Sequence, residues 1–242
     1  MNHDRRGFLK YAGSAAAALA LAGLPRAARA AAATDKLKIG VVGSGRIGGT
    51  LGGVWLKAGH EVMFSSRNIE HDRKLAASLG PGARAGTPRE AAAFGDVVLI
   101  AVPYRALPDV GKDLGGLIAG KVVIDPNNPF PSRDGEIAAW AREKGAGLAS
   151  AELLPGARIV RAFNAIGYAQ MGKAHEQPGR FGMPVASDDA DALTVVSRLI
   201  RDIGYEPVPI GGLSMGKHLM PGTPLAGERT PDQIRQVAAT LK

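Results

Sequence analysis

The fold of this chain is decided by the stretch Leu37-Lys-Ile-Gly-Val-Val-Gly-Ser-Gly-Arg-Ile-Gly48. Residues 37–42 are predicted to form a short buried strand that runs directly into a glycine-rich turn and then a helix. Gly43 allows the tight turn, Gly45 lets a diphosphate approach the backbone, and Gly48 lets the helix pack against the strand. The helix start also offers free N–H groups to an anion. This setting predicts a dinucleotide-binding site, and the alternative is a glycine-rich turn that only joins two elements.

The first thirty residues are typical of an export signal. Arg5 and Arg6 are adjacent, an alanine-rich apolar run covers residues 11–24, and Ala28-Arg-Ala30 fits a cleavage site. The apolar run is too short to cross a hydrocarbon core of about 30 Å as a helix. We interpret residues 1–30 as a twin-arginine signal and expect a periplasmic protein with no stable membrane span after cleavage. The alternatives are a retained membrane anchor and an amphipathic or disordered tail.

Composition argues against several classes of function. Residues 1–30 hold five of the 30 Lys and Arg residues and one of the 22 Asp and Glu residues, so the predicted mature chain of 212 residues carries +4 instead of +8. No basic run with interleaved aromatics is present, so nucleic acid is not an expected partner. The chain has no cysteine, and its five histidines show no metal-ligand spacing, so no metal site is expected. The residual positive charge suits a small phosphorylated ligand.

Strand and helix patterns alternate after the signal. Strands are predicted at 37–42, 60–65, 96–102, 121–125, 158–164, 183–187 and 205–210, and helices at 47–58, 88–94, 104–118, 136–144, 189–203 and from 230 onward. Thr87 and Glu90 form a predicted capping box around Pro88. This alternation predicts an α/β fold, a doubly wound and mostly parallel sheet of the Rossmann type. We expect a single domain over residues 37–220, followed by a C-terminal extension, 221–242, with a terminal helix.

The residues that follow the second strand favour one cofactor. In dinucleotide folds an acid about 20 residues beyond the glycine motif binds the ribose 2′-OH. This chain instead has Ser65, Ser66, Arg67 and Asn68 there. Hydroxyls and a guanidinium can donate to a 2′-phosphate, which a carboxylate would repel, and Arg46 adds positive charge nearby. The pattern favours NADP(H) over NAD(H); the alternatives are that Arg67 is only solvated and that Glu70 is the functional acid.

Three further segments end predicted strands at one edge of the sheet. They are Ala101-Val102-Pro103, Asp125-Pro-Asn-Asn-Pro129 and Phe163-Asn164. Ligands of open α/β sheets bind outside the carboxyl ends of the strands, so these segments predict a pocket. Ordinary turn chemistry is the alternative, because Asn and Pro often follow strands for local reasons.

Together these pieces resemble the NADP oxidoreductase family that includes the NADP-dependent reductases of factor 420, a deazaflavin coenzyme. The resemblance is carried by Ile39–Gly48, Ser65–Arg67, Ala101–Pro103, Arg161-Ala-Phe-Asn-Ala165 and Gly212-Leu-Ser214. It runs in order from about residue 37 to residue 220, and its order and its Ala-Phe-Asn segment are more specific than the glycine loop. A similar domain forms the cytosolic reductase part of the six-transmembrane metalloreductases.

The resemblance implies hydride transfer between NADP(H) and a planar second redox group, such as a deazaflavin or flavin co-substrate. Such a reaction needs positioning and exclusion of water more than a dedicated acid or base, so no catalytic residue is expected. The cofactor-binding set that it implies is Gly43, Ser44, Gly45, Arg46, Ile47, Gly48, Ser65, Ser66, Arg67, Asn68, Ala101, Val102, Pro103, Ala162 and Asn164. Within it, the serines and Arg67 would hold the 2′-phosphate, and Val102, Pro103, Ala162 and Asn164 would line the nicotinamide side.

The identity of the acceptor stays open. An export signal is unusual for a deazaflavin reductase, and the Gly- and Pro-rich stretch 215–225 either contacts the second substrate, with Lys217 and His218 as anion binders, or is a surface loop. A reductase of imines or 2-hydroxy acids is an alternative for which the chain leaves little room. A non-catalytic NADP-binding periplasmic module is another. The oligomeric state is also open, with a homodimer as one option.

Overall fold

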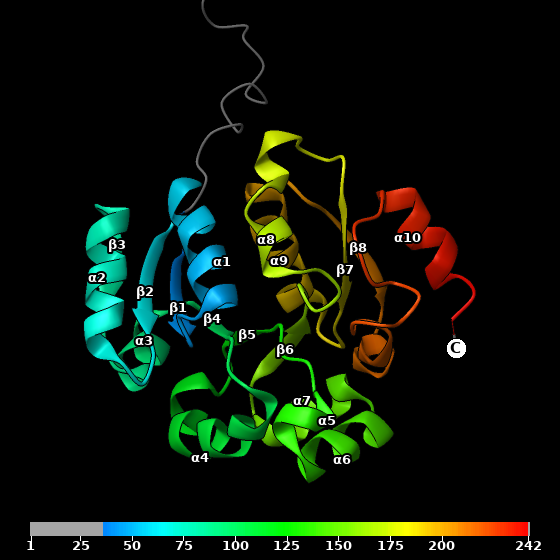
Figure 1. Cartoon of the computed structure of the whole chain (residues 1–242), viewed down its shortest axis with the longest axis horizontal. Helices are drawn as coiled ribbons and strands as arrows, with labels where there is room; N and C mark the ends of the chain where they lie inside the picture. The colour runs from blue at the N-terminus through cyan, green and yellow to red at the C-terminus, as the bar shows by residue number, and fades with distance from the viewer. Residues whose placement is uncertain (1–35, 242) are drawn as a thin grey trace, which may run out of the picture. The chain divides into compact units, whose positions relative to one another are not determined.

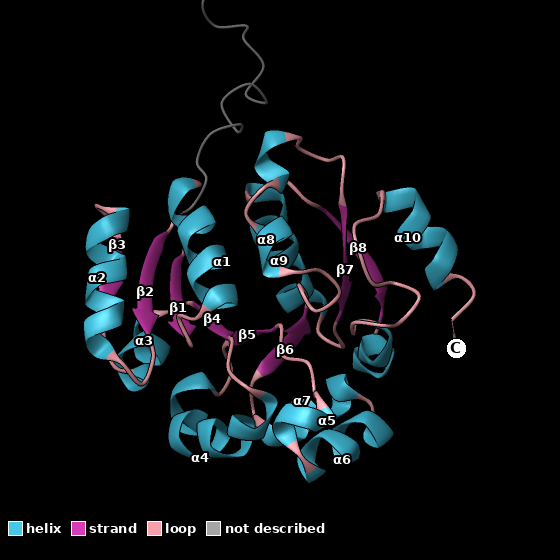
Figure 2. Ribbon diagram, in the orientation of Figure 1, coloured by secondary structure: helices cyan, strands magenta, loops and turns pink. Residues whose placement is uncertain are grey.

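Eight strands form one sheet in the part of the chain that the computed structural model describes, residues 36–241 (Figure 2). The predicted signal lies outside these residues. The strands are β1 (Lys38–Val42), β2 (Glu61–Ser65), β3 (Ala83–Ala85), β4 (Val97–Ile100), β5 (Val122–Asp125), β6 (Arg158–Arg161), β7 (Gly182–Ala186) and β8 (Glu206–Gly211). Their order across the sheet is β3-β2-β1-β4-β5-β6-β7-β8. No helix in this described range has the length and apolarity needed to cross a bilayer.

The sheet is mostly parallel, as the alternation predicts. Strands β1 to β6 run parallel, β7 pairs antiparallel with β6, and β8 runs parallel to β7. Strand β2 lies on one side of β1 in the sheet, and β4 lies on the other side, so the order of the strands reverses at β1. Val42, the last residue of β1, therefore pairs with both Ser65 and Ile100. The glycine loop thus begins at the switch point of the sheet, where open α/β folds bind their ligands.

Helices cover both faces of the sheet (Figure 1). They are α1 (Arg46–Lys57), α2 (Ile69–Leu79), α3 (Pro88–Phe94), α4 (Leu107–Ile118), α5 (Pro131–Asp134), α6 (Glu136–Lys144), α7 (Ala146–Leu153), α8 (Tyr168–Met171), α9 (Ala190–Asp202) and α10 (Pro231–Ala238), with short 3-10 turns η2 (Tyr104–Ala106), η3 (Ala174–Glu176) and η4 (Leu213–His218). The core on one face includes residues of α1, α2, α8 and α9, and that on the other includes residues of α3, α4, α6 and α7. Trp55 of α1 donates to the Leu199 carbonyl of α9 at 2.9 Å and so joins two helices of the first face.

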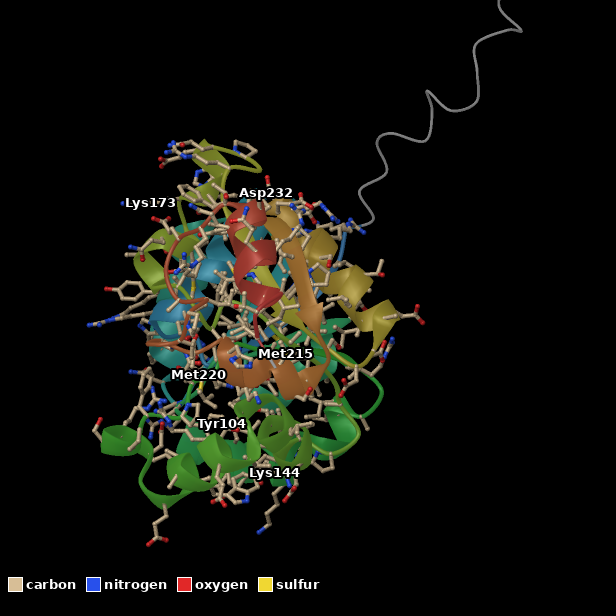
Figure 3. All side chains as sticks on the ribbon, turned by 90° about the vertical axis from the view of Figure 1, so that its right-hand side faces the viewer. Tyr104, Lys144, Lys173, Met215, Met220 and Asp232 are labelled. Atoms are coloured by element: carbon tan, nitrogen blue, oxygen red, sulfur yellow. The ribbon has the colours of Figure 1, made fainter. Side chains whose placement is uncertain are left out.

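The C-terminal extension packs against the last two strands. Ile234 of α10 joins a small core with Val208 of β8 and Leu219. In Figure 3, Met215 and Met220 lie below α10, in the segment that connects β8 to this helix. The capping box predicted before α3 is present, with the Thr87 hydroxyl and the Glu90 carboxylate each accepting the other's backbone N–H.

Two predicted strands end earlier than expected. The strand predicted to reach Asn164 ends at Arg161, because Phe163 takes a left-handed backbone conformation (φ 67°) that no strand can contain. The strand predicted to reach Val102 ends at Ile100. Helix α2 and the short strand β3 were not predicted, although Asn68 is a good helix start and caps α2 by accepting the His71 N–H at 3.1 Å.

Candidate functional site

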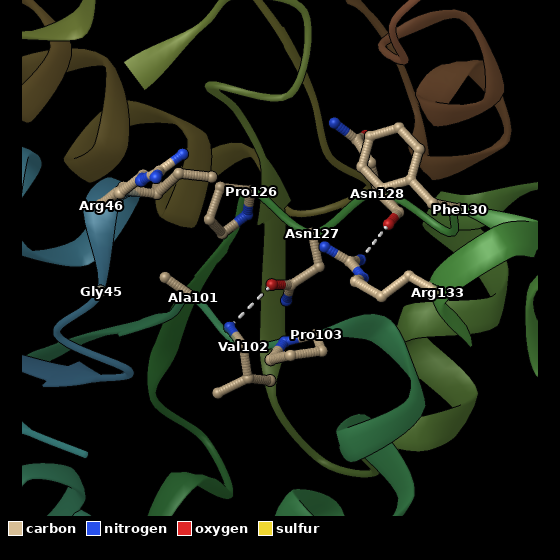
Figure 4. A pocket seen from close by; sticks show the side chains of 11 residues that line it. Gly45, Arg46, Ala101, Val102, Pro103, Pro126, Asn127, Asn128, Phe130 and Arg133 are labelled. Atoms are coloured by element: carbon tan, nitrogen blue, oxygen red, sulfur yellow. Dashed lines mark hydrogen bonds between the residues drawn. The ribbon is translucent and has the colours of Figure 1, made fainter. Parts of the chain in front are cut away.

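A pocket of about 280 Å³ opens at the carboxyl edge of β1, β4 and β5 (Figure 4). Its lining residues come from the start of α1 and from the segments after β4 and β5: Gly45, Arg46, Ile47, Ala101, Val102, Pro103, Pro126, Asn127, Asn128, Phe130 and Arg133. Six of the predicted cofactor residues line this pocket. Three come from the glycine loop and the start of α1 (Gly45, Arg46, Ile47), and three come from the segment after β4 (Ala101, Val102, Pro103). The described part of the chain contains no cluster of side chains able to hold a metal ion.

The three motif glycines meet different surroundings. Gly43 has φ 100°, and a Cβ there would lie 2.2 Å from the Ala101 carbonyl oxygen. A Cβ on Gly48 would lie 2.1 Å from the Gly43 carbonyl oxygen. A Cβ on Gly45 would meet no other part of the described chain within 4 Å. Gly43 and Gly48 are therefore needed for packing, whereas Gly45 faces open space where a ligand can approach the backbone.

The start of α1 is suited to an anion. Gly45 is its N-cap and supplies no side-chain oxygen, and the first turn contains no acidic residue. The N–H groups of Gly43 and Ser44 are already used, because both donate to the Ser65 carbonyl, at 2.8 and 2.9 Å. The N–H groups left to a ligand are hence those of the first helical turn, at the positive end of the helix dipole.

The hydroxyls of Ser65, the last residue of β2, and Ser66, which follows it, were predicted to bind the 2′-phosphate, but both form hydrogen bonds within the protein. Ser65 is fully buried and its hydroxyl donates to the Val41 carbonyl at 2.7 Å. The Ser66 hydroxyl donates to Asp72 at 2.9 Å and accepts the Asn68 N–H at 3.0 Å. We therefore remove both hydroxyls from the predicted phosphate-binding set. Ser44 of the glycine loop likewise donates to Asp72, a buried acid of α2 that sequence reasoning missed.

Arg67 and Asn68 are exposed beside these serines. Arg67 makes no hydrogen bond or ion pair within residues 36–241, so its guanidinium is available. The Asn68 side-chain oxygen caps α2, which leaves its amide N–H₂ as a donor. Glu70, the alternative acid, pairs with Arg73 at 2.5 Å on the exposed face of α2.

A buried polar network supports the floor of the pocket. Asp125 is fully buried and accepts from the equally buried Arg161 at 2.5 Å and from the Asn127 side chain at 2.8 Å. The Asn127 amide also donates to the Ile100 carbonyl at 2.7 Å, and its oxygen accepts the Val102 N–H at 3.0 Å (Figure 4). Asn127 thereby holds the ends of β4 and β5 together. The sequence signal for it was the polar run after β5.

Ala162 and Asn164 do not line the pocket, contrary to the prediction. Ala162 is fully buried in the core. The Asn164 amide donates to the Asp125 and Asn127 carbonyls at 3.1 and 3.3 Å, so Asn164 holds the end of β5 and the loop after it. Its own oxygen is buried and has no hydrogen-bond partner in the described part of the chain. Phe163 between them packs edge-on against Trp55, with ring centres 5.9 Å apart.

Two cation–aromatic pairs involve residues of the pocket. The Arg46 guanidinium lies 5.3 Å from the centre of the Tyr168 ring, and that of Arg133 lies 5.0 Å from the Phe130 ring. Phe130 is 37% and Tyr168 42% exposed, which is high for large apolar side chains. Lys217, predicted as an anion binder with its neighbour His218, lies in η4, which packs on α7, and neither residue lines the pocket.

Comparison with known proteins identifies relatives of this chain. Residues 38–129 match the family described as NADP oxidoreductase, coenzyme F420-dependent. The F420-dependent NADP reductase of Methanothermobacter thermautotrophicus is 31% identical over 205 residues, which cover 78% of this chain and 87% of the reductase. The metalloreductase STEAP3 of Rattus norvegicus is 28% identical over 182 residues, or 75% of this chain, and this chain spans only 35% of its length.

The fold also has close matches among solved structures. A hypothetical protein from Sinorhizobium meliloti superposes with a TM-score of 0.70, covering 81% of this chain and 95% of that protein. The two sequences are 24% identical. At this level of identity the match supports the fold and carries no conclusion about activity.

Proposed function

The chain belongs to the coenzyme F420-dependent NADP oxidoreductase family and is an NADP-dependent oxidoreductase, and we propose that it transfers hydride between NADP(H) and a planar acceptor such as a deazaflavin or flavin. The observation that supports this most directly is the open space at Gly45, above a helix start whose N–H groups have no side-chain cap. When bound there, the nicotinamide cofactor supplies the hydride or accepts it. The chain's own residues bind, orient and shield it.

Two groups of residues fit the phosphates of NADP(H). The first-turn N–H groups of α1 can bind the diphosphate, since Gly45 leaves room for it and the first turn of α1 contains no acidic residue. Arg67 is the group suited to the 2′-phosphate, because it is exposed and its charge is not neutralised by a carboxylate within the described residues. A guanidinium forms paired, charge-assisted hydrogen bonds to phosphate. The Asn68 amide stands beside it as a further donor.

The wall of the pocket formed by the segment after β4 suits a nicotinamide ring. The Ala101 N–H donates to the Val42 carbonyl at 2.8 Å and the Val102 N–H donates to Asn127, while Pro103 has no N–H. This wall consequently presents no free backbone donor and is largely apolar. It can position a ring and exclude water, which is what hydride transfer requires.

Proton chemistry has no candidate side chain in the pocket. The ionisable lining residues are Arg46 and Arg133, which stay protonated in proteins. Tyr104, which directly follows Pro103, is fully buried, and burial together with the charge of Asp125 raises the pKa of its hydroxyl to about 12. A reaction that moves a hydride directly between two bound rings is consistent with such a lining.

The acceptor is proposed to bind beside Phe130 and Arg133. The exposed Phe130 ring offers a flat surface on which a planar acceptor can stack. Arg133 shares its charge with Asp134, to which it donates at 2.8 Å, whereas Arg46 forms no ion pair within residues 36–241 and its guanidinium lies over the Tyr168 ring. An anionic tail on the acceptor would therefore be attracted mainly to Arg46. The signal predicted at residues 1–30 would place this reaction in the periplasm.

Fluorescence titration with NADPH and NADH tests the cofactor assignment. NADPH should bind more tightly, and Arg67→Ala should weaken NADPH binding by about ten- to a hundredfold while leaving NADH binding nearly unchanged, since hydrogen bonds to charged groups contribute about 1.5–3 kcal/mol. Arg73→Ala, a change of an exposed arginine already paired with Glu70, is the matched control.

Three results would count against parts of the proposal. An equal loss of NADPH and NADH affinity in Arg67→Ala would contradict the 2′-phosphate assignment. Binding of NADPH without oxidation by any deazaflavin or flavin would favour a non-catalytic NADP-binding module. If the protein binds neither nucleotide, the proposed function is wrong.

A further inference from the structure

Asp72 is a fully buried carboxylate in the first turn of α2. One of its oxygens accepts the Ser44 hydroxyl of the glycine loop, and the other accepts the Ser66 hydroxyl of the β2–α2 loop at 2.9 Å. Ser44 and Ser66 are 22 residues apart, and the two loops are those to which the diphosphate and the 2′-phosphate are assigned. A single side chain therefore connects both halves of the proposed cofactor site.

The position of Asp72 is unusual for an acid near a helix start. Acids in a first turn commonly stay at the surface and interact with the helix dipole, as Glu70 does in the same turn. Burying a carboxylate is costly unless it is hydrogen-bonded. Here each oxygen of Asp72 accepts a hydroxyl from a different loop, and these two bonds offset the cost of burying the carboxylate.

The hydrogen-bond directions restrict what the serines can do. Each serine has one hydroxyl proton. Ser44 donates its proton to Asp72, and the Ser66 hydroxyl lies closer to Asp72, at 2.9 Å, than to its second acceptor, the Asn68 carbonyl, at 3.2 Å. The Ser66 oxygen in turn accepts the Asn68 N–H at 3.0 Å, which orders the backbone next to Arg67. Asp72 thus acts on Arg67 through Ser66 and on the backbone beside Gly45 through Ser44.

We propose that Asp72 is a positioning residue, which fixes the glycine loop against the β2–α2 loop so that the start of α1 and Arg67 bind the same cofactor molecule. This inference rests on the proposed function. It assigns side-chain recognition of the 2′-phosphate to Arg67 with the Asn68 amide, because the Ser65 hydroxyl donates to the Val41 carbonyl and the Ser66 hydroxyl donates to Asp72.

Variants at position 72 separate positioning from simple stability. Asp72→Ala removes both of these side-chain hydrogen bonds and leaves the two loops joined only by the backbone bonds from Gly43 and Ser44 to the Ser65 carbonyl. Asp72→Asn has nearly the same shape, and its amide can donate to one serine while its oxygen accepts from the other, since serine hydroxyls rotate to either role. Asp191→Ala is the matched control, because it also removes an acid from the first turn of a helix, α9, but Asp191 is exposed.

The experiment uses the purified full chain and two readouts below the unfolding temperature of every variant. Amide hydrogen exchange is measured without ligand over residues 43–46 and 65–68, and dissociation constants are measured for NADPH and NADH. Asp72→Ala should exchange faster in both loops and bind both nucleotides about tenfold more weakly, a loss of about 1.4 kcal/mol. Asp72→Asn should stay close to the wild type, and Asp191→Ala should match it.

Wild-type exchange and affinity in Asp72→Ala would overturn the proposal, as would an Asp72→Asn variant as impaired as Asp72→Ala. If Asp72→Ala does not fold, Ser44→Ala and Ser66→Ala carry the test, because each removes one of the two bonds. Failure of the wild type to bind either nucleotide would refute the proposed function instead. The exchange measurement on the ligand-free protein would still decide whether Asp72 connects the loops.

Discussion

Replacing Gly45 by alanine should weaken cofactor binding without harming the fold. Gly45 has an extended backbone (φ −67°), and an added Cβ would meet no other part of the described chain within 4 Å. Gly48, three residues later, is the opposite case, because its Cβ would lie 2.1 Å from the Gly43 carbonyl oxygen. The two substitutions add the same methyl group to one motif and so form a matched pair.

The expected effect of Gly45→Ala on stability is small. Alanine at a compatible backbone position stabilises a protein by about 0.4–1 kcal/mol, because the unfolded chain loses freedom. Gly45 is also the N-cap of α1, where alanine is poorer than glycine by an amount of similar size, about 1 kcal/mol or less. These two effects oppose each other, so the free energy of unfolding should change by less than about 1 kcal/mol.

The expected effect on binding is larger. A methyl group on Gly45 would occupy the space through which a diphosphate reaches the first-turn N–H groups of α1. Losing one such charge-assisted contact costs about 1.5–3 kcal/mol, which corresponds to roughly a ten- to hundredfold weaker dissociation constant for NADPH and NADH alike. Gly48→Ala, by contrast, should lower stability by about 1–3 kcal/mol, since the backbone must move to relieve the overlap.

Thermal unfolding and fluorescence titration of both variants measure the two quantities. The reasoning is refuted if Gly45→Ala binds NADPH as tightly as the wild type, because the open space would then not be the approach of the diphosphate. It is refuted also if Gly45→Ala is destabilised as much as Gly48→Ala, since the backbone at Gly45 would then not tolerate a side chain.

Three further predictions concern stability. Arg161→Met leaves the buried Asp125 carboxylate without its partner and should lower the free energy of unfolding in urea by about 3–5 kcal/mol; an unchanged midpoint would contradict this. The Arg158 guanidinium holds the pKa of Asp189 well below its usual range, so the stability from this pair is present above the unfolded pKa of about 3.9 and is lost as the pH falls below it. Asp189→Asn, which keeps a cap acceptor, should therefore show a smaller fall in Tm between neutral and acidic pH, and an unaltered profile would count against the pair. Thr87→Ala removes a capping box and should lower stability by about 1 kcal/mol in the same urea assay, whereas no change would show that the box is dispensable.

Much of the fold follows from local patterns. Strand and helix periodicity, the glycine loop and the capping signals depend on residues close together in the chain, and they predicted a doubly wound sheet that the structure confirms. The common edge of the strand ends was predictable for the same reason, since parallel strands end at one side of a sheet. The helix α2 was missed because the segment after Arg67 was interpreted as a loop: only Asp72 and Ala76 of α2 are buried, so its sequence lacks a strong apolar stripe.

Side-chain direction at the site was not predictable in this way. Ser65, Ser66 and Asn164 are polar residues at a ligand-binding edge, yet their side chains bond Val41, Asp72 and the backbone after β5. Alternation along a strand predicts which residues share a face of the sheet. It does not predict which of them forms a hydrogen bond to a buried acid of another element, as Ser66 does to Asp72 of α2. The sequence by itself thus determined the class of fold, placed the glycine loop and the segments after β4 and β5 at one edge of the sheet, and led to the proposal that Arg67 binds the 2′-phosphate. Only the tertiary structure decided which polar groups stay free for a ligand, because most buried donors and acceptors form hydrogen bonds within the protein.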